Sequence, residues 1–103
     1  GRESLRLILS QPKNALLKQD ERLFEIDGIE LEIDEEAKGY IVDKALEYKL
    51  GARGLRTLCE AVFTDAMFEM PSGELKHLKV DKTYVEAQLE THSKSLNTLK
   101  AAS

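Results

Sequence analysis

Two arginines near the middle of the chain have the residue type and the spacing to bind a phosphate group. Arg53 and Arg56 lie in the segment GARGLR at residues 51–56, where one predicted helix ends and the next begins. A helix start carries free backbone N–H groups and partial positive charge, so it attracts anions and mildly disfavours cations. A guanidinium group matches the geometry of a phosphate. We therefore predict a phosphate-sensing arginine at this helix start.

The local sequence treats the two arginines differently. Glu60 lies four residues after Arg56, and a surface ion pair at that spacing, worth about 0.2–0.5 kcal/mol, would explain Arg56. Arg53 has Thr57 at the same spacing and no acidic residue nearby. Two interpretations of Arg53 therefore stay open, a solvated surface side chain or a ligand-binding one.

Other reactive side chains do not form a recognisable site. Cys59 lies on the apolar face of a predicted helix, where a thiol is a small, inert core residue. His77 and His92 lack a neighbouring Cys or His at metal-ligand spacing, so we expect ordinary surface histidines and no metal site. The sequence shows neither a Walker A loop nor a dinucleotide-binding glycine motif. We therefore predict no catalytic residue, and the chain's status as an enzyme stays open.

Helical and strand patterns alternate around the arginines. Apolar spacing predicts helices, and the alternation of Ile29-Glu30-Leu31-Glu32-Ile33 predicts a half-buried strand. Asp34 is suited to cap the helix that follows this strand, and Gly51 is suited to end it. The expected helices are 3–10, 12–25, 35–50, 53–70 and 82–89, the expected strands are 29–33 and 77–81, and the tail 91–103 is expected to be poorly ordered.

The helix expected over 12–25 contains a conflict. Its apolar stripe consists of Leu16, Leu17, Leu23 and Phe24, yet Asp20 belongs to the same stripe by spacing. An unpaired buried carboxylate is costly. Asp20 is therefore expected either at a solvated rim or beside a basic partner such as Lys13 or Lys49.

Composition limits the classes of protein that fit. The chain has 103 residues, of which 42% are hydrophobic and 33% charged, as in a single globular domain. The net charge of −4 argues against nucleic-acid binding by bulk electrostatics, and no apolar run reaches the length of a membrane span. The lone Cys59 fits a reducing compartment. We expect a cytoplasmic protein without nucleic-acid or membrane partners.

Four segments, in order, carry a family resemblance. The segment GARGLR at 51–56 with the apolar helix after it resembles the sensor-2 motif of AAA+ small domains. The segment PKNALLKQ at 12–19 with the following Leu-Phe pair, the strand region 28–32 and the segment DAMFEMPS at 65–72 are similar to the C-terminal small domain of the ClpX family. Together the matches cover about residues 5–85, so they are more specific than the hexapeptide alone.

The resemblance implies a fold and a division of the chain. It implies an α+β class, the small AAA+ C-terminal lid domain, with three or four helices packed on a small sheet of two or three strands. Residues 1–11 would be the end of a linker or hinge helix, 12–90 the small domain, and 91–103 the tail.

The resemblance also implies a function. A nucleotide, ATP or ADP with Mg²⁺, would bind between a large ATPase domain and this small domain. Arg53 would be the sensor-2 arginine, and Gly51 and Ala52 would let the backbone approach the nucleotide. The parent would be a hexamer that unfolds proteins and delivers them to the Clp protease. This chain by itself is expected to be a monomer that holds no cofactor and does not hydrolyse ATP.

Asp20 departs from the family pattern, and two alternative functions stay open. The family usually has an aromatic residue at this position, so Asp20 is expected to weaken the local core or a contact between subunits. One alternative function is a standalone α/β protein-interaction module that acts as an adaptor. The other is the lid of a related HslU-type unfoldase.

Overall fold

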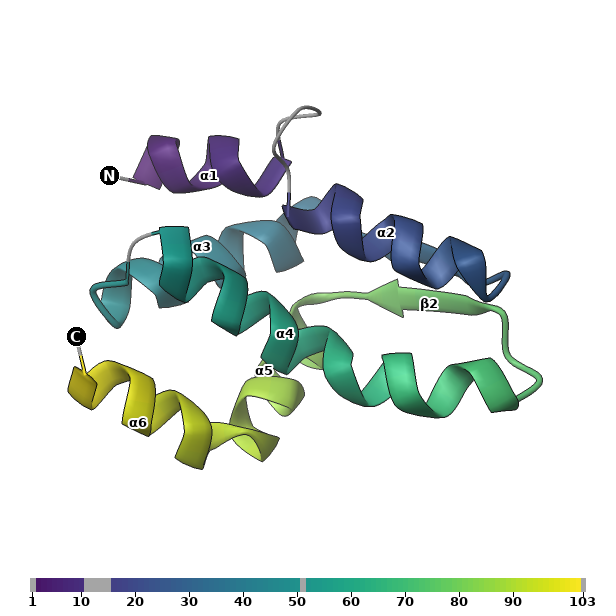
Figure 1. Cartoon of the computed structure of the whole chain (residues 1–103). Helices are drawn as coiled ribbons and strands as arrows, with labels where there is room; N and C mark the ends of the chain where they lie inside the picture. Colours follow the sequence, from purple (N-terminus) through teal and green to yellow (C-terminus); the bar gives the residue numbers. More distant parts are fainter. Residues whose placement is uncertain (1, 11–15, 51, 103) are drawn as a thin grey trace.

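The computed structural model describes residues 2–10, 16–50 and 52–102, and in this part of the chain the fold is α+β, as predicted. The described residues form six α-helices, a short 3₁₀ helix and two β-strands. Figure 1 shows how the helices are arranged. Four of the six helices begin within residues 12–90, the range predicted for the small domain, in agreement with the predicted three or four. The elements are α1 (Arg2–Ser10), α2 (Leu16–Ile26), β1 (Glu30–Ile33), α3 (Glu35–Glu47), α4 (Ala52–Glu69), η1 (Met70–Ser72), β2 (His77–Val80), α5 (Lys82–Thr91) and α6 (Ser93–Ala102).

The two strands pair in parallel, with Glu30 opposite His77 and Ile33 opposite Val80. Parallel neighbours need a long crossover connection, and here α3, α4 and η1 supply it. The apolar residues of both strands pack against the core, while Glu30 and His77 are exposed. The sheet therefore has one face on the core and one face in solvent.

An aspartate follows each strand and starts the next helix. The Asp34 side chain accepts a hydrogen bond from the backbone N–H of Ala37 at 2.7 Å, which confirms the predicted cap of α3. The Asp81 side chain accepts one from the N–H of Tyr84 at 2.8 Å and caps α5. Both helices thus begin at defined points directly after the sheet.

Helix α4 is the centre of the core. It contacts α1, α2, α3 and α5 and crosses the middle of the molecule in Figure 1. Phe63 of α4 meets Phe24 of α2 edge to face, with ring centroids 6.2 Å apart. The fully enclosed residues of α4 are Leu55, Leu58, Val62 and Phe63. The predicted wide apolar face is confirmed, and it fixes where the start of α4 lies.

Three sequence expectations about side chains and ends are wrong. Leu23 is 51% exposed, because it lies at the edge of the apolar stripe on the rim of a groove between α2 and α4. Helix α3 ends at Glu47, earlier than the expected Gly51, because Lys49 takes the left-handed conformation with φ 58°. The tail expected to be poorly ordered contains α6, which packs on α5 and buries Leu96 in the core.

Helix α1 packs on α3, α2 and α4, and Leu5 and Leu9 are buried in the core. The segment named as the end of a linker is therefore attached to the domain. The proposed boundaries at residues 11 and 90 stay predictions. Among the described residues no helix is both long and apolar enough to span a bilayer.

Candidate functional site

Arg53 lies in the first turn of α4, and its side chain is exposed. Its guanidinium group makes no ion pair or hydrogen bond with any other residue that the structure describes. Its backbone carbonyl accepts a hydrogen bond from the Thr57 hydroxyl at 3.5 Å. The structure thus places a solvent-facing guanidinium on a rigid helix, beside the backbone N–H groups of a helix start.

The C-terminal end of α3 is closed by two backbone hydrogen bonds. The N–H of Leu50 donates to the carbonyl of Ala45 at 2.8 Å, and the N–H of Lys49 donates to the carbonyl of Leu46 at 3.0 Å. These two bonds form a Schellman motif, with Lys49 in the left-handed position and Leu50 buried after it. The backbone therefore leaves α3 along a defined path as far as Leu50.

Gly54 is a positioning residue that the sequence analysis did not single out. A side-chain carbon at this position would lie 2.5 Å from Cβ of Leu50, closer than nonbonded carbons approach. The absence of a side chain therefore lets Leu50 pack directly against the first turn of α4. Of the other predicted site residues, Ala52 begins α4 and Gly51 lies outside the described residues. The role of Gly51 stays a prediction, and the contact of Gly54 with Leu50 became visible only in the folded chain.

Arg56 lies one turn after Arg53 and has a different role. It donates a hydrogen bond to the side-chain oxygen of Gln19 on α2 at 3.3 Å. The predicted ion pair with Glu60 is absent from the part of the chain that the structure describes. Arg56 therefore joins α4 to α2, whereas Arg53 is available to a ligand.

Asp20 lines the groove between α2 and α4, together with Arg56 and Glu60. The pKa of Asp20 is raised from 3.8 to about 6; burial is the largest cause, the charge of Arg56 opposes it, and the charge of Glu60 adds to it. Of the two predicted basic partners, Lys13 lies outside the described residues and Lys49 makes no described pair with Asp20. Arg56 from α4 is the cation that acts on this carboxylate, and the half-buried position fits the predicted rim.

Cys59 lies in the core, and His92 contacts a neighbouring helix. Cys59 is buried, and this burial raises the pKa of its thiol, so it is the inert core residue that was expected. The ring nitrogen of His92 lies 3.2 Å from a carboxylate oxygen of Asp65, which also accepts a hydrogen bond from Gln88. His92 therefore links α4 to the junction of α5 and α6.

Comparisons with known proteins identify relatives of the whole domain. Residues 1–93 match the family described as the C-terminal, D2-small domain of ClpB protein. The chain is 53% identical over 88 residues to the ATP-dependent Clp protease ATP-binding subunit ClpX of Porphyromonas gingivalis, covering 85% of this chain and 21% of that protein. It is 53% identical over 89 residues to the same subunit of Bacteroides thetaiotaomicron, covering 86% of this chain and 22% of that protein.

The corresponding subunit of Bacteroides fragilis is 52% identical over 89 residues, covering 86% of this chain and 21% of that protein. The chain thus spans about a fifth of the length of the curated relatives it matches. The resemblance to the small domain of the ClpX family is confirmed.

Proposed function

The chain belongs to the family of the C-terminal, D2-small domain of ClpB protein, and from this we propose that it is the nucleotide-sensing small domain of a ClpX-type protein unfoldase. It is the small domain of a Clp-type AAA+ ATPase. The matched region is about a fifth of each relative, so the activity and partners of a whole protein are part of the proposal.

The exposed guanidinium of Arg53 carries the proposal. In this proposal Arg53 reaches the terminal phosphates of ATP bound between this domain and a large ATPase domain. A guanidinium fork pairs well with phosphate oxygens, and the N–H groups at the start of α4 favour the same negative charge. Gly51 and Ala52 let the backbone approach the nucleotide. Bound Mg²⁺ neutralises phosphate charge in such a site.

The core explains how sensing is passed on in this proposal. Helix α4 packs on four other helices. When Arg53 binds phosphate, the small domain therefore moves as a rigid body. The small domain then moves against its large domain and against the neighbouring subunit of a hexamer. The assembled protein uses these movements to unfold proteins in the cytoplasm for the Clp protease. The chain by itself is a monomer and does not hydrolyse ATP.

The test compares Arg53 with Arg56 in the full-length protein that contains this chain. Arg53→Ala is expected to lower ATP turnover by about 10²-fold, because it removes a positioned cation from the reacting phosphate. Arg56→Ala is the matched control, since it removes an exposed arginine of the same helix that bonds to Gln19. It is expected to leave turnover near the wild-type value. Arg53→Lys tests whether charge without the planar fork suffices.

Light scattering and nucleotide binding complete the experiment. With an intact ring, selective loss of turnover in Arg53→Ala supports the sensing role. Equal turnover in the wild type and Arg53→Ala would return Arg53 to a solvated surface role and leave the adaptor alternative. Equal losses in both variants would indicate damage to α4 and contradict a role specific to Arg53.

A further inference from the structure

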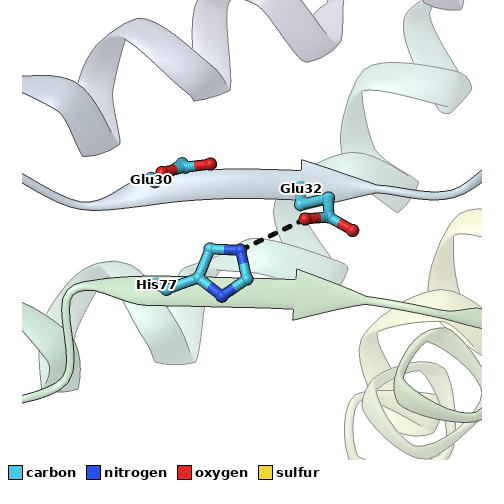
Figure 2. Close-up of side chains that lie close together, drawn as sticks. All are labelled: Glu30, Glu32 and His77. Atoms are coloured by element: carbon cyan, nitrogen blue, oxygen red, sulfur yellow. Dashed lines mark hydrogen bonds and ion pairs between the residues drawn. The ribbon is translucent and has the colours of Figure 1, made fainter.

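The solvent-facing side of the sheet brings together three side chains with metal-binding atoms. Glu30 and Glu32 lie on β1, and His77 lies on β2 (Figure 2). Each offers one ligand atom, and the three atoms lie within 4.8 Å of one another. Local sequence spacing does not reveal this cluster, because Glu32 and His77 lie 45 positions apart in the chain.

The parallel register creates the arrangement. Glu30 pairs directly with His77, and Glu32 lies two positions along the same strand on the same face. Nε2 of His77 lies 3.3 Å from a carboxylate oxygen of Glu32, as the dashed line in Figure 2 marks. Glu30 makes no ion pair with any residue in the described ranges. Its carboxylate is therefore available to a cation that also contacts the other two.

We propose that Glu30, Glu32 and His77 form a binding site for a divalent transition-metal ion of the zinc type. One imidazole nitrogen and two carboxylate oxygens are a ligand set that zinc accepts, with water completing the tetrahedron. The imidazole favours zinc over Mg²⁺, which prefers oxygen ligands and keeps its waters.

The three ligand atoms need to move only slightly closer together to bind one zinc ion. Zinc–ligand bonds of about 2.0–2.1 Å in a tetrahedron place ligand atoms about 3.3 Å apart. The side chains of His77 and Glu32 are 51% and 52% exposed, so they can rotate without disturbing the core. Binding at an exposed site is therefore reversible, and the ion joins β1 to β2.

Lys79 places a positive charge beside the cluster of Glu30, Glu32 and His77. It lies opposite Glu32 in the register, on the same face of the sheet, and makes no ion pair within the described residues. Its positive charge weakens cation binding at the cluster without blocking a ligand atom. Replacing it with a neutral residue should therefore tighten zinc binding.

Zinc chloride titrated into the 103-residue chain, followed by NMR of the imidazole groups, tests the site. The chain has two histidines, so His92 serves as an internal control. The His77 signals are expected to shift and saturate, while the His92 signals stay in place. Mg²⁺ at the same concentrations is expected to move neither, and the thermal midpoint of unfolding should rise with zinc.

Variants decide between a built site and general attraction of cations to carboxylates. His77→Ala and Glu32→Gln should each weaken zinc binding by at least about tenfold, since loss of even an indirect partner has that effect in metal sites. His92→Ala should bind like the wild type, and Lys79→Ala more tightly. Equal zinc binding by the wild type and His77→Ala, an equal response to Mg²⁺, or no His77 shift at millimolar zinc would each overturn the proposal.

Discussion

Helices α2 and α3 end in the same backbone geometry with different residues at the decisive position. After α2, the N–H of Ile29 donates to the carbonyl of Phe24 at 2.9 Å, and Gly28 has φ 73°. After α3, the N–H of Leu50 donates to the carbonyl of Ala45 at 2.8 Å, and Lys49 has φ 58°. In both, the residue after the left-handed position is buried.

The interactions that end a helix are therefore distinct from the residue type that lowers the free-energy cost of the left-handed position. At each end the left-handed residue also donates its own N–H, from Gly28 to the carbonyl of Glu25 and from Lys49 to that of Leu46. These hydrogen bonds and the buried residue that follows recur at both ends, so they define the closure. Glycine removes the steric penalty of the left-handed conformation at Gly28, whereas Lys49 retains it. The strained end is the one that leads into the first turn of α4, where Arg53 lies.

The largest effect is expected from the buried residues that follow each end. Ile29→Ala and Leu50→Ala should each lower the free energy of unfolding by about 2–5 kcal/mol, because each deletes enclosed apolar volume. Chemical denaturation of the chain measures both. A loss at one end with little loss at the other would show that only one end depends on its apolar anchor.

Gly54→Ala is expected to be the next most damaging change. The added carbon would lie 2.5 Å from Cβ of Leu50, and relieving that overlap should outweigh the helix-propensity gain, for a net loss of about 1–2 kcal/mol. Gly39→Ala is the matched control, since its added carbon would lie 3.6 Å from the Arg2 side chain. Thermal unfolding of both variants should show a loss for Gly54 and a gain for Gly39.

Gly28→Ala tests the backbone penalty alone. An added side-chain carbon there has no atom within 4 Å, so only the left-handed conformation opposes it. We expect a loss of about 1 kcal/mol in the free energy of unfolding. An unchanged midpoint in urea would mean that the end of α2 relaxes without strain.

Lys49→Gly is the reciprocal change and should stabilise the chain. Relief of the left-handed penalty exceeds the entropy that glycine loses on folding, for a net gain of about 0.5–1 kcal/mol. Lys49→Ala keeps the strain and removes the charge, so it should leave the midpoint nearly unchanged. A destabilised glycine variant would refute the inference that Lys49 is strained.

The last prediction concerns the pH dependence of stability and Asp20 on α2. Its pKa is raised from 3.8 to about 6, mainly by burial, so the folded state holds its proton more tightly than the unfolded state. Stability should therefore fall as pH rises from about 4 to about 6. Urea titrations at several pH values measure this dependence. Asp20→Asn should reduce the change in the free energy of unfolding between about pH 4 and about pH 6. An unaltered pH dependence in this variant would show that other groups cause it.

Prediction from the sequence is correct where local chemistry decides the structure. The Asp34 cap, the strand alternation and the apolar face of α4 each depend on residues close in the chain. It failed at Lys49, because propensity assigns a left-handed position to glycine and tertiary packing of Leu50 imposed it on lysine. Helix α6 was also missed, because its composition is largely polar and it docks through the burial of Leu96.

The candidate site was predictable only in part. The position of Arg53 at a helix start follows from the residues around it, and the structure agrees. The partner of Arg56 did not follow, because Gln19 lies 37 positions away and is reached only through the packing of α2 on α4. The cluster of Glu30, Glu32 and His77 likewise depends on a strand register that local patterns do not encode.

The long crossover between the strands has a consequence for synthesis on the ribosome. Strand β1 leaves the ribosome well before β2, because Glu32 and His77 are 45 positions apart, so for that interval β1 lacks β2 as a partner. Unpaired edges invite pairing with other chains, and charged side chains along a strand discourage it. Glu30 and Glu32 therefore protect the nascent chain from aggregation until the sheet closes.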